Sequence, residues 1–263
     1  MSRLKGKNIV ITGASSGIGA DVAIEVAKQG GNPILIARRA ERLDELLNQI
    51  KVDFGIDGMA YSLDVSNTDE VSRIFELIYR EAGNIDVLIN NAGFAQFKDV
   101  HETTNEEVKA MFEVNVFGLI ACTTAVLPTM KARNTGQIIN IASIIGKIPT
   151  PKASAYAATK HAVLGFTNAL RMETSDTNIQ ITAINPGPVK TAFFQIADQQ
   201  GNYTKNISNM MLDSKTVARK IVSTIGTKKR ELNLPGWMGF GGKCYALFPT
   251  FMEKTLGKRL FQK

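Results

Sequence analysis

The chain has 263 residues, of which 44% are hydrophobic, and a formal net charge of +7. This composition is typical of a globular protein that buries its own core. Basic residues are scattered rather than interleaved with aromatic residues in one patch, which argues against nucleic-acid binding. Cys122 and Cys244 are far apart and are expected to be free thiols, and no His or Cys spacing indicates a metal site. The sequence shows no signal-peptide pattern, and we expect no apolar run to be long enough to span a bilayer. We therefore expect a cytoplasmic protein.

Apolar stretches of strand length alternate with helical patterns along the chain. In chain order we predict a strand at 8–12, a helix at 17–30, a strand at 33–37, a helix at 40–53, a strand at 59–63, a helix at 71–82 and a strand at 86–90. A long helix at 106–131 follows, then a strand at 137–142, a helix at 155–171, a strand at 179–184, a helix at 216–224 and a strand at 231–234. Apolar strands separated by helices indicate a parallel sheet covered on both faces.

The predicted fold is therefore α/β, a Rossmann-type doubly wound parallel sheet in a three-layer α/β/α sandwich. Neither a linker nor an internal repeat is visible, so we expect one domain over residues 1–263. Residues 186–213 form the least regular part of the chain. Long loops in compact domains often cover binding sites, and residues 188–213 are our candidate for a substrate lid.

A glycine-rich turn joins the first predicted strand to the first helix. Its residues are Thr12, Gly13, Ala14, Ser15, Ser16, Gly17, Ile18 and Gly19. Glycine lets the backbone turn tightly and approach a phosphate, and the helix N-terminus attracts an anion. The spacing G-x-x-x-G-x-G lacks the Lys-Ser/Thr of an ATPase loop. Although a tight strand–helix turn could have a purely structural role, this position in the chain predicts a pyrophosphate site.

The end of the second predicted strand distinguishes NAD from NADP. An acidic residue would hold the ribose 2′-hydroxyl of NAD, but Ala37 stands there, followed by Arg38 and Arg39. Two guanidinium groups can hold a 2′-phosphate, although both could also be surface residues of a helix start. Asp64, at the end of the third strand, could accept a hydrogen bond from the adenine amino group or could be a helix N-cap or turn residue. We expect NADP(H).

Tyr156 and Lys160 are four residues apart on a predicted helix and so share one face. An ammonium beside a phenol lowers the pKa of the phenol and prepares it for general acid–base catalysis. Ser143 follows a strand, at the sheet edge where ligands bind in such folds. No G-x-S-x-G pattern surrounds it, which argues against a serine hydrolase. Taken alone, the Tyr–Lys pair could also be a packed or surface pair.

Together these motifs resemble the short-chain dehydrogenase/reductase family along nearly the whole chain, in its NADP-preferring branch. The matching residues, in the family's order, are Thr12 to Gly19, Asn90-Asn91-Ala92-Gly93, Asn115, Ser143, Tyr156, Lys160, Pro186-Gly187 and Thr191. The resemblance implies Ser143, Tyr156, Lys160 and Asn115 as catalytic residues. It also implies cofactor contacts by Gly13, Ser15, Ser16, Gly17, Ile18, Gly19, Arg38, Arg39, Asp64, Val65, Asn91, Ala92, Gly93, Tyr156, Lys160, Pro186, Gly187, Val189 and Thr191.

The implied reaction is hydride transfer from NADPH to the carbonyl of a small molecule. Tyr156 would supply the proton, Lys160 would hold the nicotinamide ribose, Ser143 would polarise the carbonyl, and the backbone of Asn115 would help to hold a water molecule. Two alternatives are an enzyme that mainly oxidises alcohols and an NADP-binding regulatory protein without turnover. The intact triad argues against the latter, and NADP preference favours reduction.

Apolar residues next to the motifs suggest an apolar ketone or aldehyde, although several could simply pack the core. They are Phe94, Ile144, Ile145, Phe193 and Phe194. The family resemblance implies a homodimer or homotetramer.

The C-terminal tail, 244–263, combines basic residues with an apolar stripe formed by Phe248, Phe251, Met252, Leu256 and Leu260. Packing on the core or at a subunit interface is one interpretation of this pattern. The other is an amphipathic segment in weak peripheral contact with a membrane.

Overall fold

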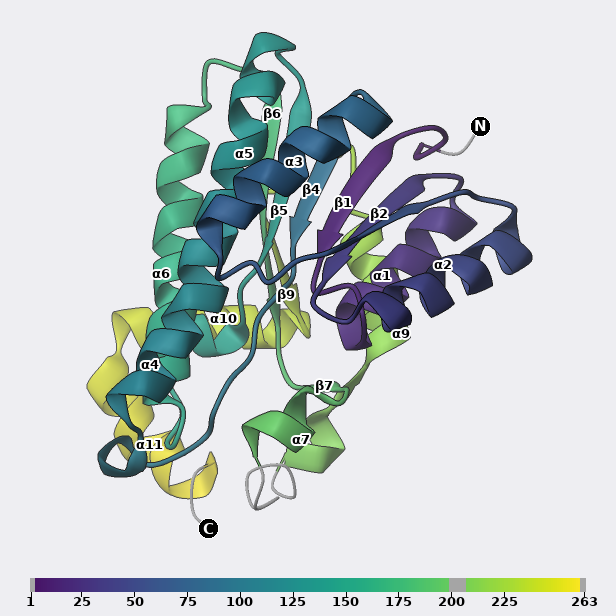
Figure 1. The fold of residues 1–263 in the computed structure, drawn as a ribbon. Coiled ribbons are helices and arrows are strands. Elements are labelled where there is room, and N and C mark those ends of the chain that lie inside the picture. Colours follow the sequence, from purple (N-terminus) through teal and green to yellow (C-terminus); the bar gives the residue numbers. More distant parts are fainter. Residues whose placement is uncertain (1–2, 199–206, 261–263) are drawn as a thin grey trace.

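Seven parallel strands form the central sheet of the computed structural model, which describes residues 3–198 and 207–260 (Figure 1). In spatial order they are β3 (Met59–Ser62), β2 (Asn32–Ala37), β1 (Asn8–Thr12), β4 (Val87–Asn90), β5 (Gly136–Ile141), β6 (Ile179–Pro186) and β9 (Glu231–Leu234). Each neighbouring pair is parallel. The predicted doubly wound Rossmann-type fold is confirmed, with each predicted strand within two residues of its bounds.

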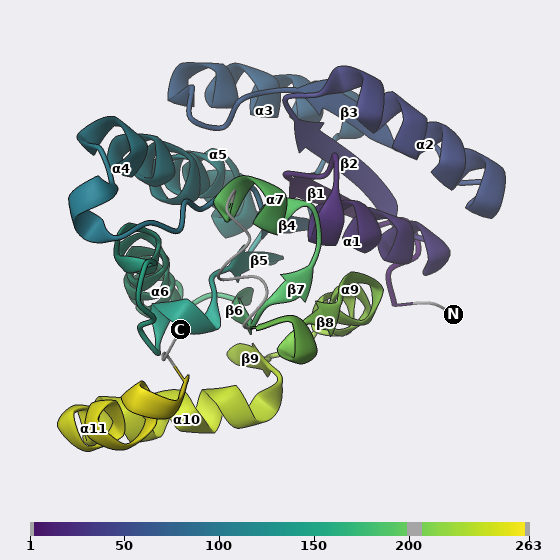
Figure 2. The same ribbon diagram turned by 90° about the horizontal axis from the view of Figure 1, so that it is seen from below.

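Helices cover both faces of this sheet (Figure 2). One face is covered by α1 (Gly17–Lys28), α2 (Ala40–Phe54) and α9 (Ser214–Val222), and the other by α3 (Thr68–Ala82), α5 (Leu119–Ala132) and α6 (Ser154–Glu173). Strand β1 shows why both layers form. Ile9 and Ile11 belong to the core on the first face and Val10 to the core on the second, because successive side chains of a strand alternate in direction.

The helix predicted at 106–131 is correct in extent but wrong in continuity. It consists of α4 (Asn105–Phe112), a π-helical segment η2 (Glu113–Gly118) and α5. The expectation that no apolar segment could span a bilayer is also corrected, because residues Asn105–Ala132 meet that test by length and composition. In the structure, Cys122, Val126 and Met130 of this helix pack in the core against the sheet and α3.

Several short elements were not predicted. They are η1 (Val100–Glu102), η3 (Ile144–Gly146), β7 (Val189–Lys190), α7 (Phe193–Ala197), η4 (Ser208–Met210) and β8 (Leu212–Asp213). Strands β7 and β8 pair with each other in the segment predicted as a lid. Residues 199–206 of that segment lie outside the described residues, so its role as a lid stays a prediction.

The C-terminal segment forms two helices, α10 (Gly236–Leu247) and α11 (Pro249–Leu260). The prediction of one apolar helical stripe that begins at Phe248 is therefore wrong for its first residue. Phe248 lies between the two helices and belongs to neither of them. The side chains of Leu256 and Leu260, and residues 261–263, lie outside the described part of the chain. Helices α7, α10 and α11 all lie at the end of the molecule toward which the parallel strands point (Figure 1).

Candidate functional site

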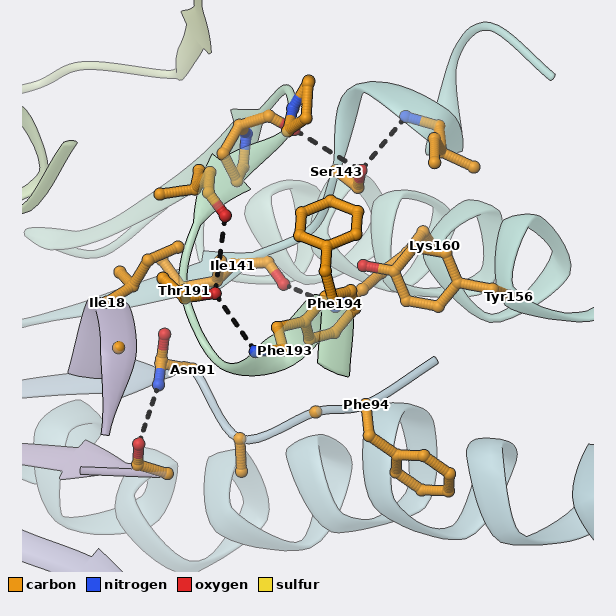
Figure 3. Close-up of a pocket in the computed structure, with 18 of the residues that line it drawn as sticks. Ile18, Asn91, Phe94, Ile141, Ser143, Tyr156, Lys160, Thr191, Phe193 and Phe194 are labelled. Carbon is orange, nitrogen blue, oxygen red and sulfur yellow. Dashed lines mark hydrogen bonds between the residues drawn. The ribbon is translucent and has the colours of Figure 1, made fainter. Parts of the chain in front are cut away.

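A cavity of about 1050 Å³ opens at the carboxyl end of the sheet. Its walls combine the glycine loop, the ends of β2, β4, β5 and β6, and apolar residues of α7 and α10. In Figure 3, Ile18 and Asn91 lie toward one end of the cavity, and Ser143, Tyr156 and Phe194 gather in another part. One space therefore joins the predicted cofactor residues to the predicted catalytic residues.

Two glycines of the loop are packed so closely that a side chain is excluded at their positions. Gly13 has a φ of +67°, and a Cβ there would lie 2.8 Å from the Cα of Ala92. A Cβ on Gly19 would lie 2.4 Å from the carbonyl oxygen of Gly13. Since only glycine tolerates these contacts, the loop backbone stays exposed to the cavity in front of the α1 N-terminus. Free N–H groups at that N-terminus are a site for a phosphate anion.

Hydrogen bonds fasten this loop to the end of β4. The Thr12 hydroxyl accepts from the backbone N–H groups of Asn91 and Ala92, both at 3.0 Å. The Asn91 amide donates to the carbonyl oxygens of Thr12 at 2.9 Å and Gly13 at 3.3 Å. These bonds hold the two cofactor motifs in one fixed arrangement, although they are far apart in sequence.

Two arginines border the glycine loop. The Arg39 guanidinium donates to the hydroxyls of Ser15 and Ser16 at 3.0 and 3.1 Å. Arg38 lies 3.7 Å from the Asp64 carboxylate in an exposed ion pair. The cluster of two guanidinium and two hydroxyl groups at the rim of the cavity suits a phosphate ester such as the 2′-phosphate of NADP.

Asp64 has the turn role that the sequence left open. Its Oδ1 accepts from the backbone N–H of Ser66 at 3.0 Å and from the Ser66 hydroxyl at 2.8 Å. The N-cap of α3 is Asn67, whose side chain accepts from Glu70 N. Asp64 also lines the cavity, so the turn and the predicted adenine contact are compatible.

Ser143 lies directly after β5 and is held through its oxygen. The backbone N–H of Ile145 donates to the Ser143 Oγ at 3.1 Å, and the hydroxyl donates to the Pro186 carbonyl over a long 3.4 Å. A 3.4 Å contact is weak, so the hydroxyl hydrogen can turn toward a ligand while the oxygen keeps its position.

Tyr156 and Lys160 are both buried on the cavity side of α6. The Lys160 ammonium lies 5.6 Å from the centre of the Tyr156 ring and donates to the Ile141 carbonyl oxygen at 2.9 Å. Burial lowers the pKa of Lys160 from 10.5 to about 8. The amine therefore remains mostly protonated at neutral pH, as a cation beside the phenol.

Asn115 does not line the cavity but lies behind it, in the π-helical segment η2. Its side chain accepts from Phe94 N at 2.9 Å and donates to Phe94 O at 2.9 Å and to the Thr159 hydroxyl at 3.1 Å. The Thr159 hydroxyl in turn donates to the Tyr156 carbonyl at 2.7 Å. Asn115 thus joins the chain after β4 to the helix that carries Tyr156.

Aromatic side chains surround Tyr156 on the side away from the glycine loop. Phe97 and Phe193 each lie 6.0 Å from the Tyr156 ring, between ring centres, and Phe194 lies 6.1 Å from Phe97. The apolar residues of this part of the cavity are Phe94, Phe97, Ile144, Ile145, Ile148, Phe193, Phe194, Ile196, Met210, Trp237 and Met238. The chemistry of these walls favours an apolar ligand.

Nearly all residues predicted for the site come together around this cavity. The exceptions are Gly19, which packs beneath the loop, and Asn115. The five apolar residues proposed from sequence neighbourhood all line it. Sequence reasoning missed Phe97, Met210, Trp237 and Met238 in the wall, and Thr159 behind it. Trp237 and Met238 lie in a glycine-rich stretch whose composition indicates a loop, and Phe97 carries no local signal.

Comparison with known proteins points to one family. Residues 7–201 match the family model described as short chain dehydrogenase. An NADP-dependent 3-hydroxy acid dehydrogenase of Schizosaccharomyces pombe is 42% identical over 73% of this chain and 75% of its own length. A farnesol dehydrogenase of Aedes aegypti is 32% identical over 88% of this chain and 94% of its own. Among solved structures, the closed form of a serine dehydrogenase complexed with NADP⁺ is 33% identical, with a TM-score of 0.77, over 86% of this chain and 93% of that one.

Proposed function

The chain belongs to the short-chain dehydrogenase/reductase family and uses NADP(H), and from this premise we propose that it reduces an apolar ketone or aldehyde to an alcohol with Tyr156 as the general acid. The observation that carries the proposal is the shared cavity, whose one end suits the dinucleotide and whose other end has aromatic walls around Tyr156 and Ser143.

The cofactor end fits NADP(H) on the geometry of this chain. The loop has no room for a side chain at Gly13 or Gly19, and Arg38, Arg39, Ser15 and Ser16 provide donors for a phosphate ester. Bound NADPH would supply the hydride. The other tasks, which are binding, orientation and proton transfer, belong to the residues of the chain.

Tyr156 donates its hydroxyl proton to the carbonyl oxygen of the substrate as that oxygen gains charge. The Lys160 cation stabilises the negative charge that develops on the phenol oxygen, and its bond to the Ile141 carbonyl keeps it in place. Ser143 turns its hydroxyl hydrogen toward the same carbonyl oxygen, because its own oxygen is held by Ile145 N–H. Two donors then converge on one acceptor, which polarises the carbonyl.

The reduction direction and the substrate class are tested together. A series of straight-chain aldehydes and 2-ketones is followed by loss of NADPH absorbance, and the corresponding alcohols are tested with NADP⁺. We expect kcat/KM to rise with chain length by up to roughly fourfold per methylene while the chain stays within the cavity, from about 0.8 kcal/mol per buried methylene. The carbonyl direction should be the faster one at neutral pH.

A short 3-oxo acid is the contrasting substrate. One relative is named an NADP-dependent 3-hydroxy acid dehydrogenase, and Lys152, which lines the cavity, lies 3.9 Å from Asp99 and could be drawn toward a carboxylate. If the oxo acid is the better substrate and Lys152→Ala lowers its kcat/KM without affecting ketones, the apolar substrate class is wrong. Faster oxidation of every alcohol would overturn the direction.

A further inference from the structure

Helix α10 buries Met238 but leaves three of its bulky apolar side chains exposed. Gly239 and Gly242 form part of its buried side, whereas Trp237 is 64% exposed, Phe240 71% and Leu247 72%. An ordinary surface helix shows the opposite arrangement, with apolar side chains on the buried face. The intervals from Trp237 to Phe240 and then to Leu247 are three and seven residues, so these side chains share one helical face.

The buried glycines fix this orientation. A Cβ on Gly239 would lie 2.5 Å from the Asn233 Nδ2, and a Cβ on Gly242 would lie 3.1 Å from the Lys147 Cβ. The helix therefore lies too close to β9 and to the segment after η3 to rotate and bury its larger side chains. The packing of the fold therefore determines that this apolar face points outward.

Exposed aromatic side chains also follow the helix along the chain. Phe248, between the two helices, is 64% exposed and Phe251 of α11 is 67% exposed. We call Trp237, Phe240, Leu247, Phe248 and Phe251 the C-terminal apolar surface. An exposed aromatic surface of this kind indicates an interaction partner.

Charge around this surface is mostly positive. Among the described side chains of residues 236–255, Lys243 and Lys254 stand against the single acid Glu253. That carboxylate accepts a hydrogen bond from the Tyr245 hydroxyl at 2.8 Å. Protein–protein interfaces are depleted in lysine, whereas aromatic residues together with lysine are typical of segments that lie on an anionic membrane.

We propose that the C-terminal apolar surface docks on an anionic lipid bilayer, with the α10 side chains among the acyl chains and Lys243 and Lys254 at the headgroups. Trp237 and Met238 also line the cavity, so the docked surface adjoins the cavity wall. An apolar substrate can then pass from the bilayer to the site. That consequence rests on the proposed function, whereas docking does not.

The chain contains one tryptophan, Trp237, which makes the docking surface its own probe. The unmodified protein is mixed with phosphatidylcholine vesicles that contain or lack phosphatidylserine. We expect a blue shift of the emission and quenching by bromine-labelled acyl chains, stronger with phosphatidylserine and weakened by salt. Unchanged emission with phosphatidylserine vesicles would overturn the proposal. So would emission that responds only to protein concentration without lipid, because the surface would then be covered by a second copy.

Substitutions locate the contact. Phe240→Asp and Leu247→Asp should each lower the vesicle partition coefficient at least tenfold in a flotation assay. Val52→Asp, at a residue 85% exposed on α2, is the matched control and should leave it unchanged. Neither measurement needs a substrate. Docking can therefore fail while the proposed reduction holds, and docking can hold while the proposed reduction fails. Equal losses in all three variants would contradict docking through α10.

Discussion

The Lys160 ammonium nitrogen lies 5.6 Å from the centre of the Tyr156 ring, on the cavity side of α6. The same nitrogen donates to the carbonyl oxygen of Ile141, the last residue of β5, at 2.9 Å. The cation is thus fixed relative to both the helix and the sheet. Because this bond holds the ammonium and both side chains are buried, the pair is suited to acid–base chemistry rather than to a flexible surface role.

Tyr156→Phe should lower kcat by roughly 10²- to 10⁴-fold, the usual contribution of a general acid or base. The substituted ring keeps its packing against Phe97 and Phe193, so folding and NADPH binding should be largely retained. Steady-state turnover and a fluorescence titration with NADPH measure the two properties separately. Turnover close to that of the unmodified enzyme would contradict the role of Tyr156.

Lys160 should make stability depend on pH in a defined direction. Burial lowers its pKa from 10.5 to about 8, so the folded state binds fewer protons than the unfolded state between these values. Stability from this group therefore rises with pH across that window, and the cost of burying the cation is fully present below pH 8.

Lys160→Met removes this cost. The substitution should therefore stabilise the folded protein more at pH 7 than at pH 10. Comparing the two proteins at each pH cancels the contribution of groups that titrate in both. Urea unfolding of the cofactor-free proteins at both pH values measures it. A difference of the opposite sign would show that the buried amine is stabilised as a cation by the folded protein.

Arg39 should determine much of the preference for NADP over NAD. It reaches the hydroxyls of Ser15 and Ser16, whereas Arg38 is engaged with Asp64. Arg39→Ala should lower the ratio of kcat/KM for NADPH to that for NADH by roughly 10- to 100-fold, the value of a charged hydrogen bond of about 1.5–3 kcal/mol. Arg38→Asp should shift the ratio in the same direction.

Arg42→Ala is the matched control for these substitutions. Arg42 lies one turn further along α2, pairs with Glu45 at 2.9 Å and does not line the cavity. Its removal should leave the cofactor ratio unchanged. An equal effect at Arg42 would mean that general surface charge, rather than contact with a 2′-phosphate, sets the preference.

The five inner strands could be predicted because each is a mostly apolar run that both sheet faces bury, whereas the edge strands β3 and β9 are only partly buried. The glycine loop, Tyr156 and Lys160 could be predicted for a related reason, since strand ends and helix periodicity place them at one edge of the sheet. Hydrogen bonds across the fold, such as Thr12 with Asn91, hold this site but leave no local sequence pattern. They appear only once the strands are placed side by side.

Two features could not be predicted for opposite reasons. The π-helical segment that contains Asn115 keeps the apolar content of a continuous helix, and periodicity does not reveal one widened turn. Helix α10 contains Gly236, Gly239, Gly241 and Gly242, a composition that indicates a loop. Close packing against Asn233 requires Gly239, and Gly242 lies against Lys147, so tertiary contacts override the low helix propensity of glycine.

The two cysteines should react very differently with an alkylating reagent. Cys122 is fully buried in the core of α5, and burial raises the pKa of its thiol to about 12. At neutral pH its thiolate fraction is therefore far below that of a thiol with an ordinary pKa. Cys244, on α10, is half-buried and remains accessible. Iodoacetamide labelling of the native protein, read by peptide mass spectrometry, should therefore modify Cys244 alone, with Cys122 reacting only in denaturant. Rapid native labelling of Cys122 would mean that α5 opens from the sheet without global unfolding.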